Sequence, residues 1–317
     1  MKWSTVQNRG LTLVKLGLKN THNRILTCGV LIGLCFLPIW LGIMVRLTID
    51  GGSTPILNLG FLYLGIQSLW QQRQQLSLLE AHEDERLVGY LMIIGGAFFF
   101  PFCLASRSLQ ALLCMVVLLG GFYSSWGSVF FKKYFLAICF LLISLYPDLI
   151  FISNAIWRIL TPHNLLENLM AWLGSMGLRT INQPAVSVGA FISIDPNLPM
   201  NPTLQSLVSS KTVEVASGCS GFDMASTLAG SSIIFGLILK QNWRQILGMM
   251  GIGIALALIL NVPRVMLVAI AAIHWGHASF EFWHGAWGGQ IFATLLFTIY
   301  YYLVMGLVNK KTKKTVT

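Results

Sequence analysis

The stretch that decides the fold is residues 245–262, QILGMMGIGIALALILNV, whose apolar character continues beyond Pro263 and Arg264 to residue 273. An α-helix rises about 1.5 Å per residue, so about 18 apolar residues extend about 27 Å, close to the roughly 30 Å hydrocarbon core of a bilayer. Seven further apolar runs lie at residues 25–45, 55–70, 87–104, 109–126, 134–152, 221–239 and 286–308. We therefore predict an all-α polytopic membrane protein with about eight transmembrane helices.

The composition excludes soluble proteins. Of the 317 residues, 55% are hydrophobic and 10% are charged, whereas a soluble domain has about 25% charged residues. This small number of polar groups could not cover a core of this size in water. Soluble globular and disordered classes are therefore excluded. The net charge is +10. In a soluble protein this excess would suggest nucleic acid, but here we expect it to report membrane topology and expect no nucleic-acid partner.

The basic residues sort to one side of the expected membrane. Of the 21 Lys and Arg residues, fifteen lie on the side that holds both termini. Five lie on the other side, namely Arg46, Arg107, Arg158, Arg179 and Lys211. Arg264 remains, within or beside the seventh span. By the positive-inside rule both termini are cytoplasmic, and the basic C-terminal tail can also contact anionic lipid of the bilayer.

One connection on the outer side, residues 153–218, is too long for a simple turn. Leucine and methionine recur at helical spacing over residues 165–176, which predicts an amphipathic helix on the membrane face that ends at Gly177. Residues 185–194 and 211–215 are β-like runs. Together they predict a small β-hairpin element just before the sixth span.

Only one of the six cysteines has polar and glycine neighbours. Five of them, Cys28, Cys35, Cys103, Cys114 and Cys139, lie in apolar runs, where a free cysteine packs as a small hydrophobe. Cys219 lies in the sequence SGCSG at the expected start of the sixth helix, whose unpaired N–H groups and dipole should lower the thiol pKa. Ser220 with Asp223 fits the start of a capping box. The alternative is a helix start that contains a cysteine incidentally.

Arg264 is the second candidate, in Asn261-Val262-Pro263-Arg264. A charge in an apolar run costs roughly 2.5–3.5 kcal/mol on insertion scales, so it indicates function by default. About 27 Å of helix from residue 245 places Arg264 near the outer face, on the same side as Cys219. Pro263 should kink the helix there. The alternative is an arginine that reaches the interface to anchor the helix end.

His284 is the third candidate, in WHGAWGG at the outer start of the eighth span. Imidazole titrates near neutral pH, which suits proton transfer. His274 and His277 lie just upstream and compete for the same role or assist in it, and an ordinary surface histidine is the alternative for all three. If Cys219, Arg264 and His284 meet at one depth, they provide what nucleophilic acyl chemistry needs: a thiolate, a cation and an imidazole.

With these motifs the sequence resembles the exosortase/archaeosortase family of membrane cysteine transpeptidases, and within it the cyanobacterial exosortase branch. The likeness is clearest over residues 155–300. It is carried by Cys219-Ser220-Gly221, Asn261-Val262-Pro263-Arg264, His284 with Gly288 and Phe292, and Val213-Glu214-Val215 before the cysteine motif. The family pattern more often has an aliphatic residue where this chain has Pro263.

The resemblance implies an enzyme of the bacterial cytoplasmic membrane with its active site on the outer face. Its substrates would be exported proteins with a PEP-CTERM-like tail, which consists of a Pro-containing motif, a transmembrane helix and a basic cytoplasmic end. Cys219 would form an acyl-enzyme, Arg264 would stabilise the oxyanion or thiolate, and His284 would protonate the leaving amine. No metal or organic cofactor is implied.

The long outer connection divides the chain into three expected regions. Residues 1–152 form an N-terminal membrane region of five spans. Residues 153–218 form the outer-face segment with its amphipathic helix and β-hairpin-like element. Residues 219–317 form a three-span catalytic region with the basic tail.

The sequence also fits two other functions. Gly218-Cys219-Ser220-Gly221 also fits the Gly-x-Ser-Gly motif of rhomboid-type intramembrane serine proteases, with Ser220 and His284 as a dyad, but this leaves Arg264 without a role. A non-catalytic transporter or assembly protein would use Arg264 to bind an anion. Such proteins commonly show repeated or broken helices in corresponding halves, and the sequence shows no such symmetry.

Overall fold

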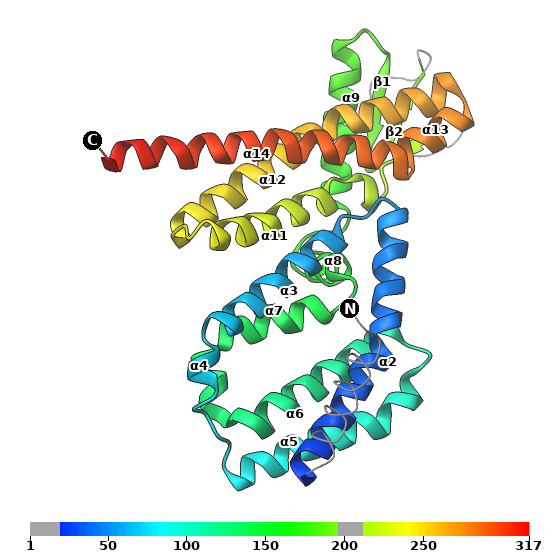
Figure 1. The fold of residues 1–317 in the computed structure, drawn as a ribbon. Helices are drawn as coiled ribbons and strands as arrows, with labels where there is room; N and C mark the ends of the chain where they lie inside the picture. Colours follow the sequence, from blue (N-terminus) through cyan, green and yellow to red (C-terminus); the bar gives the residue numbers. More distant parts are fainter. Residues whose placement is uncertain (1–19, 196–211, 317) are drawn as a thin grey trace, which may run out of the picture. The chain divides into compact units, whose positions relative to one another are not determined.

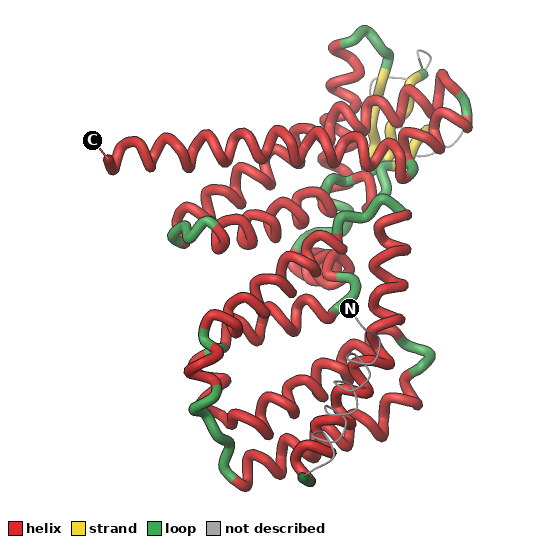
Figure 2. The backbone as a smooth tube through the Cα atoms, viewed as in Figure 1, coloured by secondary structure: helices red, strands yellow, loops and turns green. Residues whose placement is uncertain are grey.

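Helices make up most of the computed structural model, which describes residues 20–195 and 212–316 (Figures 1 and 2). Contacts divide the chain into two units. The first comprises Met1–Arg46 and Asn58–Pro147, and the second comprises Leu47–Leu57 and Asp148–Thr317. Lys211 and the basic residues before residue 20, which entered the charge sorting, lie outside the described residues.

The first unit is built from long apolar helices. Its elements are α2 (Thr21–Ile49), α3 (Thr54–Gln71), α4 (Arg73–Leu76), α5 (Glu83–Phe99), a 3-10 turn (Phe100–Cys103), α6 (Arg107–Lys133) and α7 (Phe135–Leu145), although the end of α2 and the start of α3 belong to the second unit. Helices α5 and α6 pack very closely, because a Cβ on Gly89 would lie only 2.6 Å from the Gly120 carbonyl oxygen. Large apolar side chains such as Val30 and Leu31 stay more than half exposed, as expected for surfaces that face lipid.

The predicted all-α polytopic class is confirmed. Within residues 20–195 and 212–316, five helices are long and apolar enough to cross a membrane: Thr21–Ile49, Glu83–Cys103, Arg107–Lys133, Trp243–Trp275 and Ala286–Leu307. The expected span at 55–70 corresponds to α3, and the span at 221–239 to the shorter apolar helix Phe222–Ile238. The number of eight spans stays a prediction.

The expected span at 134–152 is not one continuous helix. Helix α7 ends at Leu145, and α8 (Leu149–Leu160) starts after a break at Pro147. A proline disfavours helical geometry at the residue before it, and Tyr146 accordingly has extended backbone angles. The Asp148 side chain then caps α8 by accepting a hydrogen bond from the Phe151 N–H at 3.0 Å. Because α8 runs through residue 152, the expected region boundary there falls inside a helix.

The second unit combines helices with the small sheet. After α8 come α9 (Leu165–Thr180), β1 (Ala185–Val188), β2 (Phe191–Ile194), β3 (Thr212–Glu214), a 3-10 turn (Ser217–Cys219), α11 (Phe222–Ile238), α12 (Trp243–Ile270), a π-helical turn (Ala271–Trp275), α13 (His277–His284) and α14 (Ala286–Val316). The sheet order is β1-β2-β3 with both pairs antiparallel. Helices α11, α12 and α14 pack on one another, and α9 packs on both the sheet and α12.

The outer segment differs from the expectation in two places. Helix α9 continues to Thr180, because Gly177 packs tightly against the Met266 sulfur rather than ending the helix. Residues 185–194 form a complete hairpin instead of one strand, because Gly189 turns the chain with a φ of +57° and Val188 then pairs with Phe191. Residues 212–214 supply a third strand.

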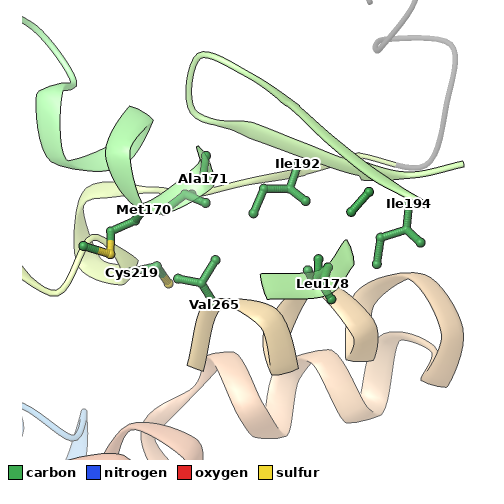
Figure 3. Close-up of a cluster of buried hydrophobic side chains, with 10 residues drawn as sticks. Met170, Ala171, Leu178, Ile192, Ile194, Cys219 and Val265 are labelled. Atoms are coloured by element: carbon green, nitrogen blue, oxygen red, sulfur yellow. The ribbon is translucent and has the colours of Figure 1, made fainter. Parts of the chain in front are cut away.

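The core of the second unit lies between the sheet, α9 and α12. Met170, Leu178, Ile192 and Val265 are among its buried members, and Cys219 is packed with them (Figure 3). The sheet and α9 therefore hold the cysteine loop against the C-terminal third of α12.

Candidate active site

Cys219 ends the 3-10 turn that joins the sheet to α11. The turn is closed by a 2.8 Å hydrogen bond from the Cys219 N–H to the Ala216 carbonyl. The side chain is 8% exposed and points toward Val265 (Figure 3). Cys219 therefore precedes α11, which begins at Phe222, rather than lying in its first turn.

The predicted capping box at Ser220 and Asp223 is wrong. Gly221 is the N-cap of α11 with a φ of +81°, and no side chain caps this helix end. The Ser220 hydroxyl instead donates to the Ser217 carbonyl at 2.7 Å. Only a residue that tolerates the left-handed region suits the N-cap backbone here, which explains the glycine.

The pKa of the Cys219 thiol is raised, not lowered as the helix start suggested. Burial is the main cause, because the thiolate is poorly solvated there, and the Arg264 guanidinium opposes this rise. Asp223 adds to the rise through charge repulsion. The resting thiol is therefore neutral at neutral pH, and Arg264 is the group that favours its ionisation.

Asn261 on α12 joins the cysteine motif to the arginine motif. Its Nδ2 donates to the Cys219 carbonyl oxygen at 2.7 Å. Asn261 is 1% exposed, and its Oδ1 has no hydrogen-bond partner among the described residues. A Cβ at Gly221 would lie 3.0 Å from the Asn261 side chain, so the close fit of the two motifs depends on this glycine.

Arg264 lies one turn after Asn261, and α12 continues through Pro263 to Ile270. The Arg264 side chain is 8% exposed, and within residues 20–195 and 212–316 its Nε finds no hydrogen-bond partner. An arginine that anchors a helix end extends its charged group to the membrane surface, so this burial argues against that interpretation of Arg264. Its charge acts on both Cys219 and His284, so it neighbours both of the other candidate residues.

His284 is the last residue of α13. Its ring stacks on Phe280, with centroids 4.9 Å apart. The residue is exposed, but partial burial of its ring lowers the pKa of the imidazole, and Arg264 lowers it further, so the ring is neutral at pH 7. Among the described residues no hydrogen bond joins His284 to Cys219, and Arg264 is the charged group near both.

His284, His277 and His274 are all exposed, so the competing histidines differ from His284 in their neighbours and not in their burial. His277 is exposed and lies 3.2 Å from Glu281, with which it forms an i,i+4 pair. His274 is exposed in the π-helical turn before α13. The Trp283 carbonyl approaches Gly288 so closely that a Cβ there would clash, so this glycine sets the turn between His284 and α14.

Sequence reasoning missed two parts of this arrangement. Asn261 was noted as part of a motif, yet its contact with the Cys219 carbonyl was not expected. Glu214 on β3 also lines the small cavity that contains Cys219 and Arg264. A buried amide in an apolar helix is itself a signal, because an unpaired polar group at that depth is costly.

Comparison with known proteins gives one match. No curated protein and no solved structure matches the chain. The model of the transmembrane exosortase family matches residues 52–301, which include all three candidate motifs. This match does not test the cyanobacterial branch, which stays a prediction. Because the match covers well over half of the sequence, the chain belongs to the transmembrane exosortase family.

Proposed function

We propose that this protein is a cysteine protease or transpeptidase that cleaves exported proteins at a C-terminal sorting signal of the PEP-CTERM type. Family membership supports a membrane transpeptidase or protease. The observation that carries the finer proposal is the 2.7 Å hydrogen bond between Asn261 and the Cys219 carbonyl, with Arg264 buried one helical turn away. We place the reaction at the outer face of the bacterial cytoplasmic membrane, with both termini cytoplasmic.

The charge states of Cys219 and His284 suit an acyl transfer. A neutral imidazole can accept the thiol proton when substrate binds, and Arg264 stabilises the thiolate that results. The sulfur then bonds to the substrate carbonyl carbon, whose oxygen becomes an oxyanion. When the C–N bond breaks, His284 returns the proton to the leaving amine. The acyl group on Cys219 passes finally to an acceptor amine or to water.

The orphaned Arg264 Nε supports a role for this residue at the oxyanion. A buried N–H without a partner costs free energy in the resting protein. A developing oxyanion would accept that hydrogen bond, so the interaction strengthens in the transition state rather than in the ground state. The low polarity of the surrounding core increases its effect.

The alternative with Ser220 as nucleophile receives less support. Ser220 is 1% exposed, and its hydroxyl already donates to the Ser217 carbonyl. It would have to break that bond and leave its buried position in order to reach a substrate.

The direct test is the capture of an acyl-enzyme. A reporter with an exported domain, a Pro-containing motif, an apolar helix and a basic tail is co-expressed with the protein. Mass spectrometry should then find a thioester between Cys219 and the C-terminal residue of the cleaved reporter, and hydroxylamine should release it. Cleavage that proceeds unchanged in Cys219→Ala would overturn the proposal.

A further inference from the structure

Strand β3 lies at one edge of the sheet and is followed in the chain by the turn that carries Cys219. Only four residues separate Glu214, its last residue, from Cys219. Within residues 20–195 and 212–316, β3 pairs with β2 and with no other strand. The edge that continues to the cysteine is therefore unpaired in the described part of the chain.

The hydrogen-bond pattern fixes which backbone groups this edge presents. The Val215 N–H donates to the Ala190 carbonyl at 2.8 Å, and Glu214 lies opposite Phe191. In an antiparallel ladder, successive residues direct their N–H and C=O groups to opposite sides. Val213 and Val215 therefore bond toward β2, and Glu214 directs its N–H and C=O to the open edge. Such an edge is a template for another strand.

A second observation points to a ligand at the same place. Val213, Glu214 and Val215 line a cavity of about 10 Å³ together with Cys219 and Arg264, and this volume is large enough for about one buried polar atom and not for a peptide. The Arg264 side chain is more than nine-tenths buried, and its Nε is unpartnered among the described residues. A buried donor without an acceptor thus borders a cavity that also reaches the nucleophile and the edge strand.

We propose that β3 binds the substrate by strand addition, so that the extended segment around the scissile bond pairs with the Glu214 backbone and brings its carbonyl to Cys219. This inference rests on the function proposed above. The partner is an extended peptide segment just outside the membrane helix of an exported protein. Backbone hydrogen bonds would supply the affinity, so many side chains are tolerated.

Strand addition also explains how a segment that contains proline can bind. A paired strand directs its N–H groups toward its neighbour at every second residue only. A proline at an intervening position loses no hydrogen bond, and it favours extended geometry in the residue before it. The substrate should therefore accept proline at alternate positions of the paired segment and reject it at the others.

Disulfide trapping in membranes tests this register. The enzyme carries Cys219→Ala, which prevents turnover, together with Glu214→Cys. The reporter carries one cysteine at each of six successive positions before its helix. We expect cross-links at alternate reporter positions with one maximum, and Thr212→Cys should move that maximum by two residues. Ser187→Cys on β1, at the other edge of the sheet, is the matched control and should give none.

Three results would overturn strand addition. Equal cross-linking at every reporter position would indicate an irregular segment instead of a strand. Absence of cross-links, while an impermeant thiol reagent still labels Glu214→Cys, would show that substrate does not bind at this edge. Trapping of Glu214→Cys by a cysteine placed within residues 196–211 would show that the chain covers its own edge. If Cys219→Ala still cleaves the reporter, the proposed function fails instead.

A proline substitution gives an independent measurement on the active enzyme. Glu214→Pro removes the N–H at the open edge and leaves the Val213 and Val215 bonds to β2 in place. Relative to Glu214→Ala, we expect KM for the reporter to rise about fivefold, as for the loss of one hydrogen bond, with a smaller change in kcat. Equal KM values in the two variants would contradict the pairing.

Discussion

The two units of the chain are both helical, yet they differ in the polar groups they bury. In the first unit, α2, α3, α5, α6 and α7 border a cavity of about 630 Å³ whose lining is almost entirely apolar. The buried polar side chains there are neutral, such as Asn58, whose Nδ2 donates to the Tyr146 carbonyl at 2.9 Å. The second unit buries Arg264, the one charged side chain among the described residues that is less than a tenth exposed. Arg86 in the first unit also has a buried Nε without a partner among these residues, but its side chain is only partly buried.

This difference distinguishes buried polar groups that stabilise the fold from buried polar groups that can take part in a reaction. A neutral amide that bonds to a backbone carbonyl satisfies its donor and ties two segments together. Burying a guanidinium whose Nε has no partner costs more free energy of desolvation than its remaining interactions provide in the resting protein. Such a cost is typical of a site that is completed by a substrate. The following predictions test whether the two units divide stability and activity in this way.

The largest effect should come from the nucleophile. Cys219→Ala removes the sulfur that forms the acyl-enzyme, so cleavage of the reporter should fall by about 10⁴-fold or more. The small change in volume should leave the protein folded. Ser220→Ala should retain most of the activity, measured by the fraction of reporter cleaved at equal enzyme level. The reverse ranking of the two variants would favour the serine mechanism.

Arg264 should have the next largest effect. Arg264→Met removes both the charge and the Nε donor, and kcat should fall about 10²- to 10³-fold with a smaller change in KM. Arg264→Lys restores the charge without the planar guanidinium and should recover only part of this loss. The exposed Arg158 on α8 provides a matched control, since Arg158→Lys should stay within about twofold of the wild type. An equally large loss of activity in the control would point to a general effect of basic residues.

Asn261 and Asn58 allow the most direct comparison of the two units. Each is a buried amide that donates to a backbone carbonyl, at 2.7 Å and 2.9 Å. Replacing either with alanine should cost about 1–3 kcal/mol of stability, seen as a lower thermal unfolding temperature in detergent. Asn261→Ala should also lower kcat about 10- to 100-fold, because the Cys219 backbone is no longer held in place. Folded Asn58→Ala should keep its kcat. Equal losses of kcat in the two variants would contradict the inference that the first unit serves stability and the second serves activity.

Hydropathy was sufficient for the class of fold and for the positions of most helices. Lipid and protein core both favour apolar side chains, so apolar runs report helices whatever the tertiary packing. The expected continuous span over residues 134–152 missed the break at Pro147, although proline restricts the backbone of Tyr146 and so gives a signal in the sequence. The split of residues 185–194 depended on Gly189 adopting a positive φ, which the alternating pattern around it did not reveal.

The site was less predictable, because its properties arise from contacts between distant segments. Residue type and expected depth were enough to propose Cys219, Arg264 and His284 as candidates. The direction of the Cys219 pKa shift was not, because it depends on burial among Met170 and Val265, which lie far away in sequence. The contact between Asn261 and the Cys219 carbonyl spans 42 residues for the same reason.

The smallest expected effect is a displacement of the pH profile. If neutral His284 accepts the thiol proton, kcat/KM falls as the pH decreases through the pKa of the imidazole. Burial and Arg264 hold that pKa below the usual 6.5, so the acid limb should lie below pH 6.5. In Arg264→Met, the residual activity should show an acid limb at higher pH, because the cation that disfavours imidazolium is gone. His277→Ala, which alters an exposed histidine paired with Glu281, should leave the profile unchanged. If the acid limb of the pH profile moves in His277→Ala, the proton transfer belongs to a histidine other than His284. If the limb stays in place in Arg264→Met, Arg264 does not influence the imidazole of His284.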